Sequence, residues 1–347
     1  MDYHLAALHP PDHRQAGRAT LSQTSSQNQS SAPHVITSTA SATRSLSSLV
    51  RGRTQEISAQ VLEHGAVLFR GFEMEQASQF QDFVGILKAE PMTYIYRSTP
   101  RTRVSDDIFT ATEYPKSLEI PLHCENAYQR SWPMWVAFCC LTPAAGGGQT
   151  PIARMRSVTA SLPRGLLDRF AVRGVKYIRH YRPYIDLSWQ DVFQTKDRFV
   201  VQEYCYRNNI NCYWIDDENL RTEQVCQGVA SHPQTGDLIF FNQAHLFHPS
   251  NLGSEILKDL IEYAGIDKLP RNATYGDDTE IIPADLEVIR AAFRSAAVDI
   301  EWAQGDVLLL DNMQFAHGRR AFTGDRRVLA SLLNPHSAPA SGQLRGV

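Results

Sequence analysis

The chain has 347 residues, 43% of them hydrophobic, which is enough for one large domain or two small ones with a sizeable core. Its formal net charge of −3 gives no overall electrostatic reason to expect nucleic acid or an anionic membrane as a partner. No stretch approaches the roughly 18 apolar residues of a membrane span, and the N-terminus lacks the apolar core of a secretory signal. We therefore expect a globular protein that is not exported.

The first 53 residues have the composition of a low-complexity, mobile leader. Half of residues 20–49 are Ser or Thr, and no acidic residue occurs between Asp12 and Glu56. Such a segment buries too little apolar surface to offset its ordering entropy. An organelle transit peptide has a similar composition, but Asp2, Asp12 and the weak amphipathicity disfavour that alternative. A single domain is expected over residues 54–340, followed by a tail at 341–347.

Within that domain, helical spacing of apolar residues predicts helices after Thr54, before Leu87, over Leu162–Phe170 and over Ala284–Ala297. Short β-like runs broken by Pro and Gly predict strands at Ala66–Phe69, Thr93–Tyr96, Pro121–Tyr128, Met134–Cys140, Thr150–Ile152, Phe199–Val201, Leu238–Phe241, Val307–Leu310 and Arg327–Leu333. Many short strands with long excursions indicate a closed or sandwiched β core. The predicted fold class is α+β, mainly β, with helices outside the sheet.

The six cysteines form no CxxC pair and no regular framework. Cys139 and Cys140 are adjacent, which makes a bridge between them difficult. We expect reduced thiols and a cytoplasmic location.

The stretch PLHCENAY, residues 121–128, carries a histidine and a glutamate two positions apart in a predicted strand. In a strand, residues i and i+2 project to the same face, so His123 and Glu125 converge while Cys124 points away. An imidazole, a carboxylate and a second histidine from elsewhere form the facial triad of non-haem Fe(II) oxygenases. A His-x-Glu pair is also common on solvated strand faces, so the metal interpretation depends on the third ligand.

Two stretches compete to supply that histidine. GDLIFFN leads to His248 and GDVLLLD leads to His317, at the same interval after Gly-Asp. After His317 a loop enters an apolar strand that begins with Arg327, ten residues further on, whereas no arginine follows His248 before Arg271. A guanidinium makes two parallel hydrogen bonds to a carboxylate, as the far end of an iron-bound dicarboxylic cosubstrate requires. Taken singly, His317 and Arg327 have ordinary structural explanations, such as a loop histidine and a surface arginine, but together they favour the metal site.

With these residues in place, the chain resembles the TauD/TfdA, or clavaminate synthase-like, family of Fe(II)/2-oxoglutarate dioxygenases, and looks most like its SyrP-like members. The similarity spans residues 60–335 and rests on GAVLFRGF, TATEYP, PLHCENAY, GGGQTPIARMRSV, FNQAHLFH, LPRNATYGD and DVLLLDNMQFAHGRRAFTGDRRVLASL. The fold that the resemblance implies is a double-stranded β-helix, or jelly roll, with flanking helices.

The resemblance also implies site roles. His123, Glu125 and His317 hold Fe(II), and Thr150 shares the distal carboxylate of 2-oxoglutarate with Arg327, since a hydroxyl beside a guanidinium adds a donor to the same oxygen. The glycines at 146–148, which precede Thr150, are also expected to form a flexible turn whatever the role of Thr150. SyrP-like enzymes commonly have Asn where this chain has Cys124. Because position 124 faces away from the iron, we expect altered packing and unaltered ligation.

Two positions narrow the chemistry that the family implies. Taurine-type enzymes carry a second arginine four residues after the cosubstrate arginine, and this chain has Ser331 there, so taurine is not the expected substrate. Halogenating relatives have Gly or Ala in place of the acid, so Glu125 indicates oxygen insertion or a related hydrogen abstraction.

The implied function is that of an oxidoreductase that uses Fe(II), 2-oxoglutarate and O₂. It hydroxylates an unactivated C–H bond of an amino-acid-like or carrier-tethered intermediate in a natural-product pathway and releases succinate and CO₂. Desaturation or cyclisation of a small molecule by the same oxidant is an alternative outcome. A non-catalytic jelly roll that binds a metal or ligand is the alternative of another class, and a zinc hydrolase is a third, although it has no use for Thr150 and Arg327.

Substrate contacts are expected from Tyr128 and Asn242. Nearby polar residues that equally suit a structural role are His245, His248 and Arg271. The stretch KYIRHYRPY holds a basic cluster of Lys176, Arg179, His180 and Arg182, which is either a solvated face or a docking surface for an acidic carrier protein. Neither nucleic acid nor a membrane is an expected partner, and a homo-oligomer is compatible with the sequence.

Overall fold

A computed structural model describes residues 31–38, 44–93, 95–105, 107–182 and 185–338, and their contacts form one unit that begins at Ser31. Ordered elements occur inside the predicted leader. Strand β1 (His34–Thr37) pairs in parallel with β2, and Leu46 and Val50 of helix α1 are buried. The predicted boundary at residue 53 is therefore wrong for residues 31–38 and 44–53. The rest of the predicted leader and the tail at 341–347 lie outside the described residues.

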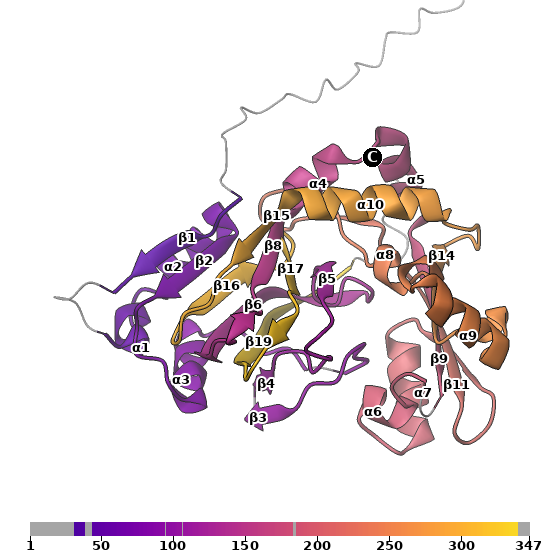
Figure 1. The fold of residues 1–347 in the computed structure, drawn as a ribbon, viewed down its shortest axis with the longest axis horizontal. Coiled ribbons are helices and arrows are strands. Elements are labelled where there is room, and N and C mark those ends of the chain that lie inside the picture. The colour runs from indigo at the N-terminus through magenta and orange to yellow at the C-terminus, as the bar shows by residue number, and fades with distance from the viewer. Residues whose placement is uncertain (1–30, 39–43, 94, 106, 183–184, 339–347) are drawn as a thin grey trace, which may run out of the picture. The chain divides into compact units, whose positions relative to one another are not determined.

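The larger of two facing sheets has seven strands, in the order β1-β2-β16-β6-β19-β4-β3, and is antiparallel except for the β1–β2 pair (Figure 1). Its strands after β1 are β2 (Ala66–Arg70), β3 (Arg103–Ser105), β4 (Ile108–Thr110), β6 (Ser131–Thr142), β16 (Val307–Asp311) and β19 (Arg327–Ser337). The long apolar runs predicted as strands are the centre of this sheet, because both of its faces are covered.

The smaller facing sheet has four antiparallel strands in the order β15-β8-β17-β5. They are β5 (Ile120–His123), β8 (Thr150–Arg154), β15 (Ala297–Ile300) and β17 (Phe315–Arg319). Alternate residues of β2, such as Ala66 and Leu68, join Phe138 and Leu308 in an apolar layer that packs against Ile152 of β8. This interior between two antiparallel sheets is that of a jelly roll.

The opposite face of the larger sheet is covered by three helices, namely α1 (Leu46–Val50), α2 (Thr54–His64) and α3 (Ala77–Leu87). Side chains of β2 that alternate with the interior ones, Val67 and Phe69, pack here against Phe80 and Phe83 of α3. The strand period of two therefore supplies two cores from one strand.

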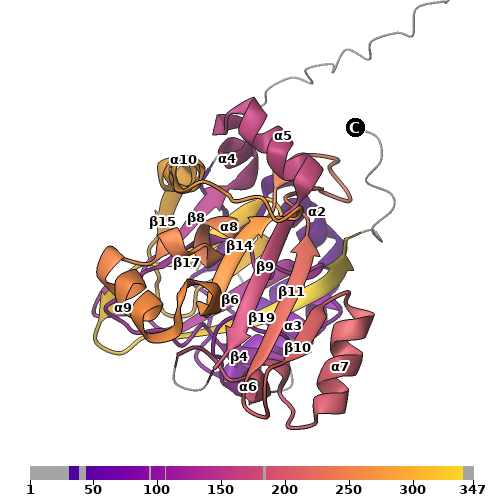
Figure 2. The same cartoon turned by 90° about the vertical axis from the view of Figure 1, so that its right-hand side faces the viewer.

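A long excursion between β8 and β15 forms a further antiparallel sheet, β10-β11-β9-β14, with most of the remaining helices around it (Figures 1 and 2). These strands are β9 (Val175–Tyr181), β10 (Asn211–Trp214), β11 (Leu220–Cys226) and β14 (Arg271–Tyr275). Short pairs are formed by β12 (Val229–Ser231) with β13 (Leu238–Phe240) and by β7 (Gly146–Gly147) with β18 (Phe322–Thr323).

The helices that follow β8 are α4 (Met155–Ser161), α5 (Arg164–Arg173), α6 (Trp189–Phe193), α7 (Arg198–Arg207), α8 (Ala244–Phe247), α9 (Ser254–Ala264) and α10 (Pro283–Ala296), with 3-10 turns at Pro249–Asn251 and Ile266–Lys268. Within the described ranges no helix is long and apolar enough to cross a membrane. All six cysteines are free thiols, as predicted.

Three strand predictions are wrong. Phe199–Val201 belongs to α7, the described residues of Thr93–Tyr96 form no regular strand, and the strand at Pro121–Tyr128 stops at His123. The apolar run Phe199–Val201 is not a buried strand, because it lies on a helix where Phe199 is 67% exposed.

Candidate metal and cosubstrate site

Antiparallel pairing of β5 with β17 brings two of the predicted ligands together. His123 lies directly opposite His317 in the register of these strands, and their ring centroids are 4.7 Å apart. Residues directly opposite one another on one face of a sheet have Cβ atoms about 4.5–5.5 Å apart, so their side chains can meet. His248, the competing candidate, caps the turn at Pro249–Asn251, and its Nδ1 is bonded to Ser250.

Glu125 reaches the two histidines from a turn. After β5 ends, the N–H of Ala127 donates to the carbonyl of Cys124, and Asn126 adopts a left-handed φ of 57°. Asparagine enters this region more readily than most residues. As a result, Oε2 of Glu125 lies 3.7 Å from Nε2 of His317. The convergence that was predicted is present, but it comes from the turn and not from strand alternation.

The donor set of these residues fits a divalent iron ion. One ligand atom each from His123, Glu125 and His317 lies within 4.8 Å of the others, and no other such group of three occurs in the part of the chain that the structure describes. Two imidazoles and a carboxylate are the facial-triad donors of Fe(II) oxygenases. Nδ1 of His123 donates to the carbonyl of Pro121 at 2.8 Å, which leaves Nε2 unprotonated for a metal.

The protonation states also suit a cation. Burial and the neighbouring His317 lower the pKa of His123 to about 4, so this imidazole is neutral near pH 7. Burial opposes ionisation of Glu125, yet the guanidinium of Arg101 and the two imidazoles hold the pKa of this carboxyl below its ordinary value. A metal ion requires a neutral imidazole and an ionised carboxylate.

Arg101 is a site residue that the sequence analysis missed. Its Nη2 donates to Oε2 of Glu125 at 2.6 Å, and both side chains are at most 5% exposed. Arg101 lies in the loop before β3, far along the chain from Glu125, so no local motif links the two.

A pocket with three arginines in its lining, called the polar pocket below, opens beside His317. It is lined by Arg101, Ala111, Thr112, Ile120, His123, Phe138, Thr150, His317, Gly318, Arg319, Arg326 and Val328. Oγ1 of Thr150 accepts from the indole N–H of Trp302 at 3.0 Å, so the hydroxyl hydrogen of Thr150 is available to an acceptor in the pocket.

Of the neighbouring arginines 326 and 327, the structure brings Arg326 to this pocket and not the predicted Arg327. Arg327 is exposed, whereas Arg326 and Val328, two residues apart on one face, line the pocket. The pairing of β19 with β6 is irregular at Arg327–Val328, so counting residues from His317 does not give the facing.

Arg326 is a partly buried cation that lines this pocket. Burial and the nearby Arg319 lower the pKa of Arg326 to about 10, so the guanidinium stays charged at neutral pH. Its Nε donates to the carbonyl of Gly148, and no carboxylate of the described residues forms an ion pair with it. A partly desolvated cation that shares a pocket with a hydroxyl donor fits the far carboxylate of a dicarboxylic acid.

Comparison with known proteins agrees with this geometry. The model of the taurine catabolism dioxygenase TauD, TfdA family matches residues 29–333. The chain belongs to the TauD/TfdA family. The prediction of this family and of the jelly-roll fold is confirmed, and the protein is an Fe(II)- and 2-oxoglutarate-dependent dioxygenase that uses O₂.

Individual relatives of this TauD/TfdA protein include the dapdiamide synthesis protein DdaC of Enterobacter agglomerans, which is 40% identical over 79% of this chain and 83% of its own. A clavaminate synthase-like protein of Arabidopsis thaliana is 29% identical over 78% and 82% of the two chains. A solved taurine dioxygenase of Burkholderia xenovorans has a TM-score of 0.50 at 15% identity, covering 90% and 93%. A solved asparagine oxygenase has a TM-score of 0.51 at 12% identity, covering 83% and 79%. The two solved structures share the fold.

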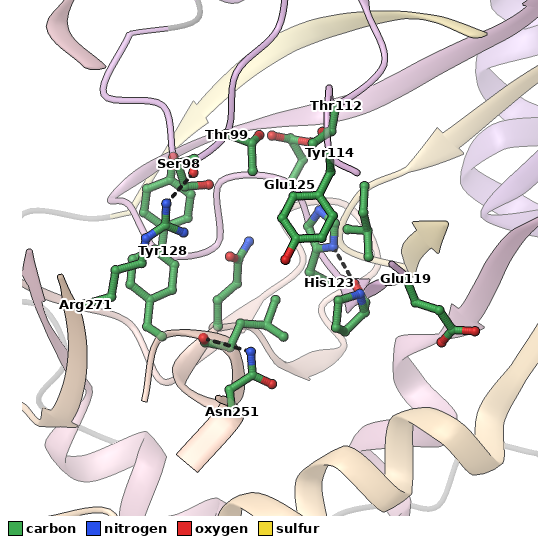
Figure 3. Close-up of a pocket in the computed structure, with 15 residues that line it drawn as sticks. Ser98, Thr99, Thr112, Tyr114, Glu119, His123, Glu125, Tyr128, Asn251 and Arg271 are labelled. Carbon is green, nitrogen blue, oxygen red and sulfur yellow. Dashed lines mark hydrogen bonds between the residues drawn. The ribbon is translucent and has the colours of Figure 1, made fainter. Parts of the chain in front are cut away.

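The second cavity of this TauD/TfdA protein borders His123 and Glu125 and has a volume of about 140 Å³ (Figure 3). Its lining comprises Ser98, Thr99, Thr112, Tyr114, Glu119, Ile120, Pro121, His123, Glu125, Tyr128, Gln243, Leu246, Phe247, Asn251 and Arg271. His123 lines both this cavity and the polar pocket, so the predicted metal ligands stand where the two meet.

Of the two predicted substrate contacts, only one borders this cavity. Tyr128 lines the cavity, and its hydroxyl donates to the carbonyl of Tyr96. Asn242 is not part of the lining, and its buried amide donates to Gly228 and accepts from the N–H of Ala244. The structure therefore does not bring the predicted contact Asn242 to this cavity, because its hydrogen bonds hold the chain between β13 and α8.

Arg271, for which the sequence equally suits a structural role, lines the cavity. Its Nε and Nη2 donate to both oxygens of Asp186, and Nη2 also donates to the carbonyl of Ser98. No described residue accepts from its Nη1. Figure 3 shows Arg271 and Tyr128 across the cavity from His123 and Glu125.

The basic cluster of KYIRHYRPY does not form one surface. Arg179 is 1% exposed and lies over the rings of Tyr96 and Tyr181, and buried His180 is bonded to the carbonyl of Leu269. Lys176 pairs with Asp278. These interactions remove the charge pattern on which carrier docking at this stretch was based.

Proposed function

We propose that His123, Glu125 and His317 are the Fe(II) ligands of this dioxygenase, and that Thr150 and Arg326 bind the far carboxylate of 2-oxoglutarate. The observation that carries the proposal is the position of the three ligands at the junction of two cavities, one of which holds a partly buried cation with no carboxylate partner among the described residues. The cosubstrate then enters from the polar pocket, and the substrate from the cavity of about 140 Å³.

When bound, Fe(II) with 2-oxoglutarate and O₂ supplies an oxidant for an unactivated C–H bond, and the products are succinate, CO₂ and the hydroxylated substrate. The chain supplies position and electrostatics. Pro121 fixes the tautomer of His123, Arg101 holds an oxygen of Glu125, and Arg326 with Thr150 fixes the cosubstrate at its far end.

The substrate class is narrowed by the size of the cavity. About 140 Å³ resembles the roughly 150 Å³ cavity known to accept benzene, so the cavity holds a group of that size and the remainder of the substrate extends outward. An amino-acid side chain presented on a free amino acid or on a carrier satisfies this limit. The relative DdaC, named for dapdiamide synthesis, supports a place in a natural-product pathway.

Arg271 is the substrate contact that we propose in place of Asn242. Because Asp186 neutralises its charge, its Nη1 offers a hydrogen-bond donor with little net attraction for an anion. A carbonyl oxygen of an amide or thioester suits it. We place the reaction in the cytoplasm, since the thiols are free.

Taurine-type enzymes carry a sulfonate-binding arginine four residues after the cosubstrate arginine. This chain has no arginine there, whether Arg326 or Arg327 binds the cosubstrate. From Arg326 the fourth residue on is Ala330, and Ser331 is buried with its hydroxyl donating to the carbonyl of Asp107. The proposal therefore excludes taurine.

The test is 2-oxoglutarate-dependent succinate formation with Fe(II) and O₂, followed across a panel of amino acids presented free, as amides and as carrier thioesters. Mass spectrometry of the product separates a gain of one oxygen, for hydroxylation, from a loss of two hydrogens, for desaturation or cyclisation. Stimulation of succinate formation by an amide or thioester supports the proposal. An enzyme that forms no succinate under any condition contradicts it.

A further inference from the structure

The glutamate ligand lies beyond the reach of the strand pairing that holds the two histidines. β5 ends at His123, so the pairing that sets His123 opposite His317 does not extend to Glu125. A side chain from another part of the chain takes over. Oδ1 of Asn312 accepts from the N–H of Glu125 at 2.7 Å, and its Nδ2 donates to the carbonyl of Glu125 at 2.9 Å.

These two bonds occupy both backbone groups of one residue, which is what a neighbouring strand does for a hydrogen-bonded residue. The second hydrogen of Nδ2 donates to the carbonyl of Pro133 at 2.9 Å, and the backbone N–H of Asn312 donates to the carbonyl of Met134 at 2.8 Å. Asn312 is fully buried and bonded at both ends of its amide. It thus ties Glu125 to β6.

The position of Asn312 in the chain links it to the second histidine. It lies in the turn between β16 and β17, and β17 carries His317. Asp311 stiffens this turn, because its Oδ1 accepts from the N–H groups of Met313 and Gln314. One short segment therefore delivers His317 and holds the backbone of Glu125, while Arg101 holds the carboxylate.

We infer that Asn312 is a positioning residue for the metal site, and that it fixes the backbone of Glu125 relative to His317 so that the carboxylate completes the ligand set. The inference rests on the proposed function, because it takes Glu125 as a ligand. Asparagine is needed because its amide has an acceptor and two donors in one plane. An aspartate would face two carbonyls with acceptors alone.

The test is the dissociation constant of Co(II) alone, from its visible absorption, together with the Tm of each metal-free variant. Asn312→Asp is expected to weaken Co(II) binding at least tenfold, within the roughly 10–100-fold range for residues that orient metal ligands. If the aspartate variant does not fold, Asn312→Ser replaces it. This variant adds no charge and is also expected to weaken Co(II) binding at least tenfold.

Asn242→Asp is the matched control, because Asn242 is equally buried and also bonds one backbone carbonyl and one N–H, but not those of Glu125. It is expected to lower the Tm and to leave the Co(II) affinity within twofold. Equal weakening by both aspartate variants, or an Asn312→Asp affinity within twofold of the wild type, overturns the inference.

Glu125→Gln separates this inference from the proposed function. If Glu125→Gln binds Co(II) as tightly as the wild type, Glu125 is not a ligand and the proposed function fails with it. If Glu125→Gln weakens binding and Asn312→Asp does not, only the role of Asn312 is wrong.

Discussion

Arg326 and Arg271 line the two cavities that meet at the predicted metal ligands, and they differ in what they already bind. Arg271 makes a bidentate ion pair with Asp186, whereas Arg326 is partly buried with no carboxylate partner among the described residues. A paired guanidinium stabilises the fold and offers one remaining donor, while an unpaired buried one stabilises little until an anion arrives. The proposed function therefore assigns the polar pocket to one charged cosubstrate and the larger cavity to a neutral group.

The largest expected effect is on 2-oxoglutarate binding, when the unpaired guanidinium of Arg326 is removed. Arg326→Gln removes the hydrogen bonds to the far carboxylate of 2-oxoglutarate, and two such bonds at about 1.5 kcal/mol each correspond to at least a 100-fold loss of affinity. Arg327→Gln, one position away but exposed, is expected to stay within twofold. The Kd for 2-oxoglutarate, measured anaerobically with Fe(II), decides between them, and a larger loss in Arg327→Gln would restore the position predicted from the sequence.

The second prediction concerns the stability of the folded protein, for which Arg271 is expected to matter more than Arg326. Arg271→Gln leaves the partly buried Asp186 unpaired and is expected to lower the free energy of unfolding by about 2 kcal/mol, less than for a fully buried pair. Arg326→Gln is expected to leave the stability of the cosubstrate-free protein unchanged or higher. Urea unfolding of both variants measures this, and equal destabilisation contradicts the distinction.

The Arg271–Asp186 contribution has a defined pH dependence. Burial opposes ionisation of Asp186, but Arg271 lowers its pKa below the ordinary value of 3.8. Because the folded-state pKa is depressed, this stability is present above about pH 4 and is lost as the pH falls through the folded-state pKa. The difference in unfolding free energy between wild type and Arg271→Gln should therefore be constant near neutral pH and shrink in acid. A difference that grows in acid would contradict the ion-pair explanation.

The smallest effect concerns the hydroxyl beside Arg326. Thr150→Val removes one donor to the cosubstrate and is expected to weaken 2-oxoglutarate binding about fivefold to tenfold, equivalent to about 1 kcal/mol. Thr150→Ser keeps the hydroxyl and should recover most of the affinity. A Thr150→Val affinity within twofold of the wild type would contradict the role of the hydroxyl.

Sequence reasoning was strongest where the signal was local and repeated. The apolar runs of β6, β16 and β19 were found because buried strands are continuously apolar. His317 was separated from His248 by the arginines that follow it, and the structure places His317 beside His123. In α7, the N-cap Asp197, whose side chain accepts from the N–H of Phe199, was a local helix signal that the strand prediction overlooked.

What sequence reasoning missed depends on contacts between distant residues or on strand facing. The partner of Arg101 is 24 residues away and that of Asn312 is 187 residues away, so no spacing pattern exposes either. Arg326 and Arg327 differ only in the face they occupy, and the irregular pairing beside them decides it. Glu125 was found although it lies in a turn, because His-x-Glu brings the two side chains together in that geometry too.

The most direct test of the metal site is an anaerobic titration with Fe(II) and 2-oxoglutarate that follows the visible charge-transfer band of the chelate in wild type, His317→Ala and His248→Ala. If the ligands are assigned correctly, the band saturates at one Fe(II) per chain in wild type and in His248→Ala, and no band forms in His317→Ala. A band that survives in His317→Ala, or that disappears in His248→Ala, would contradict it.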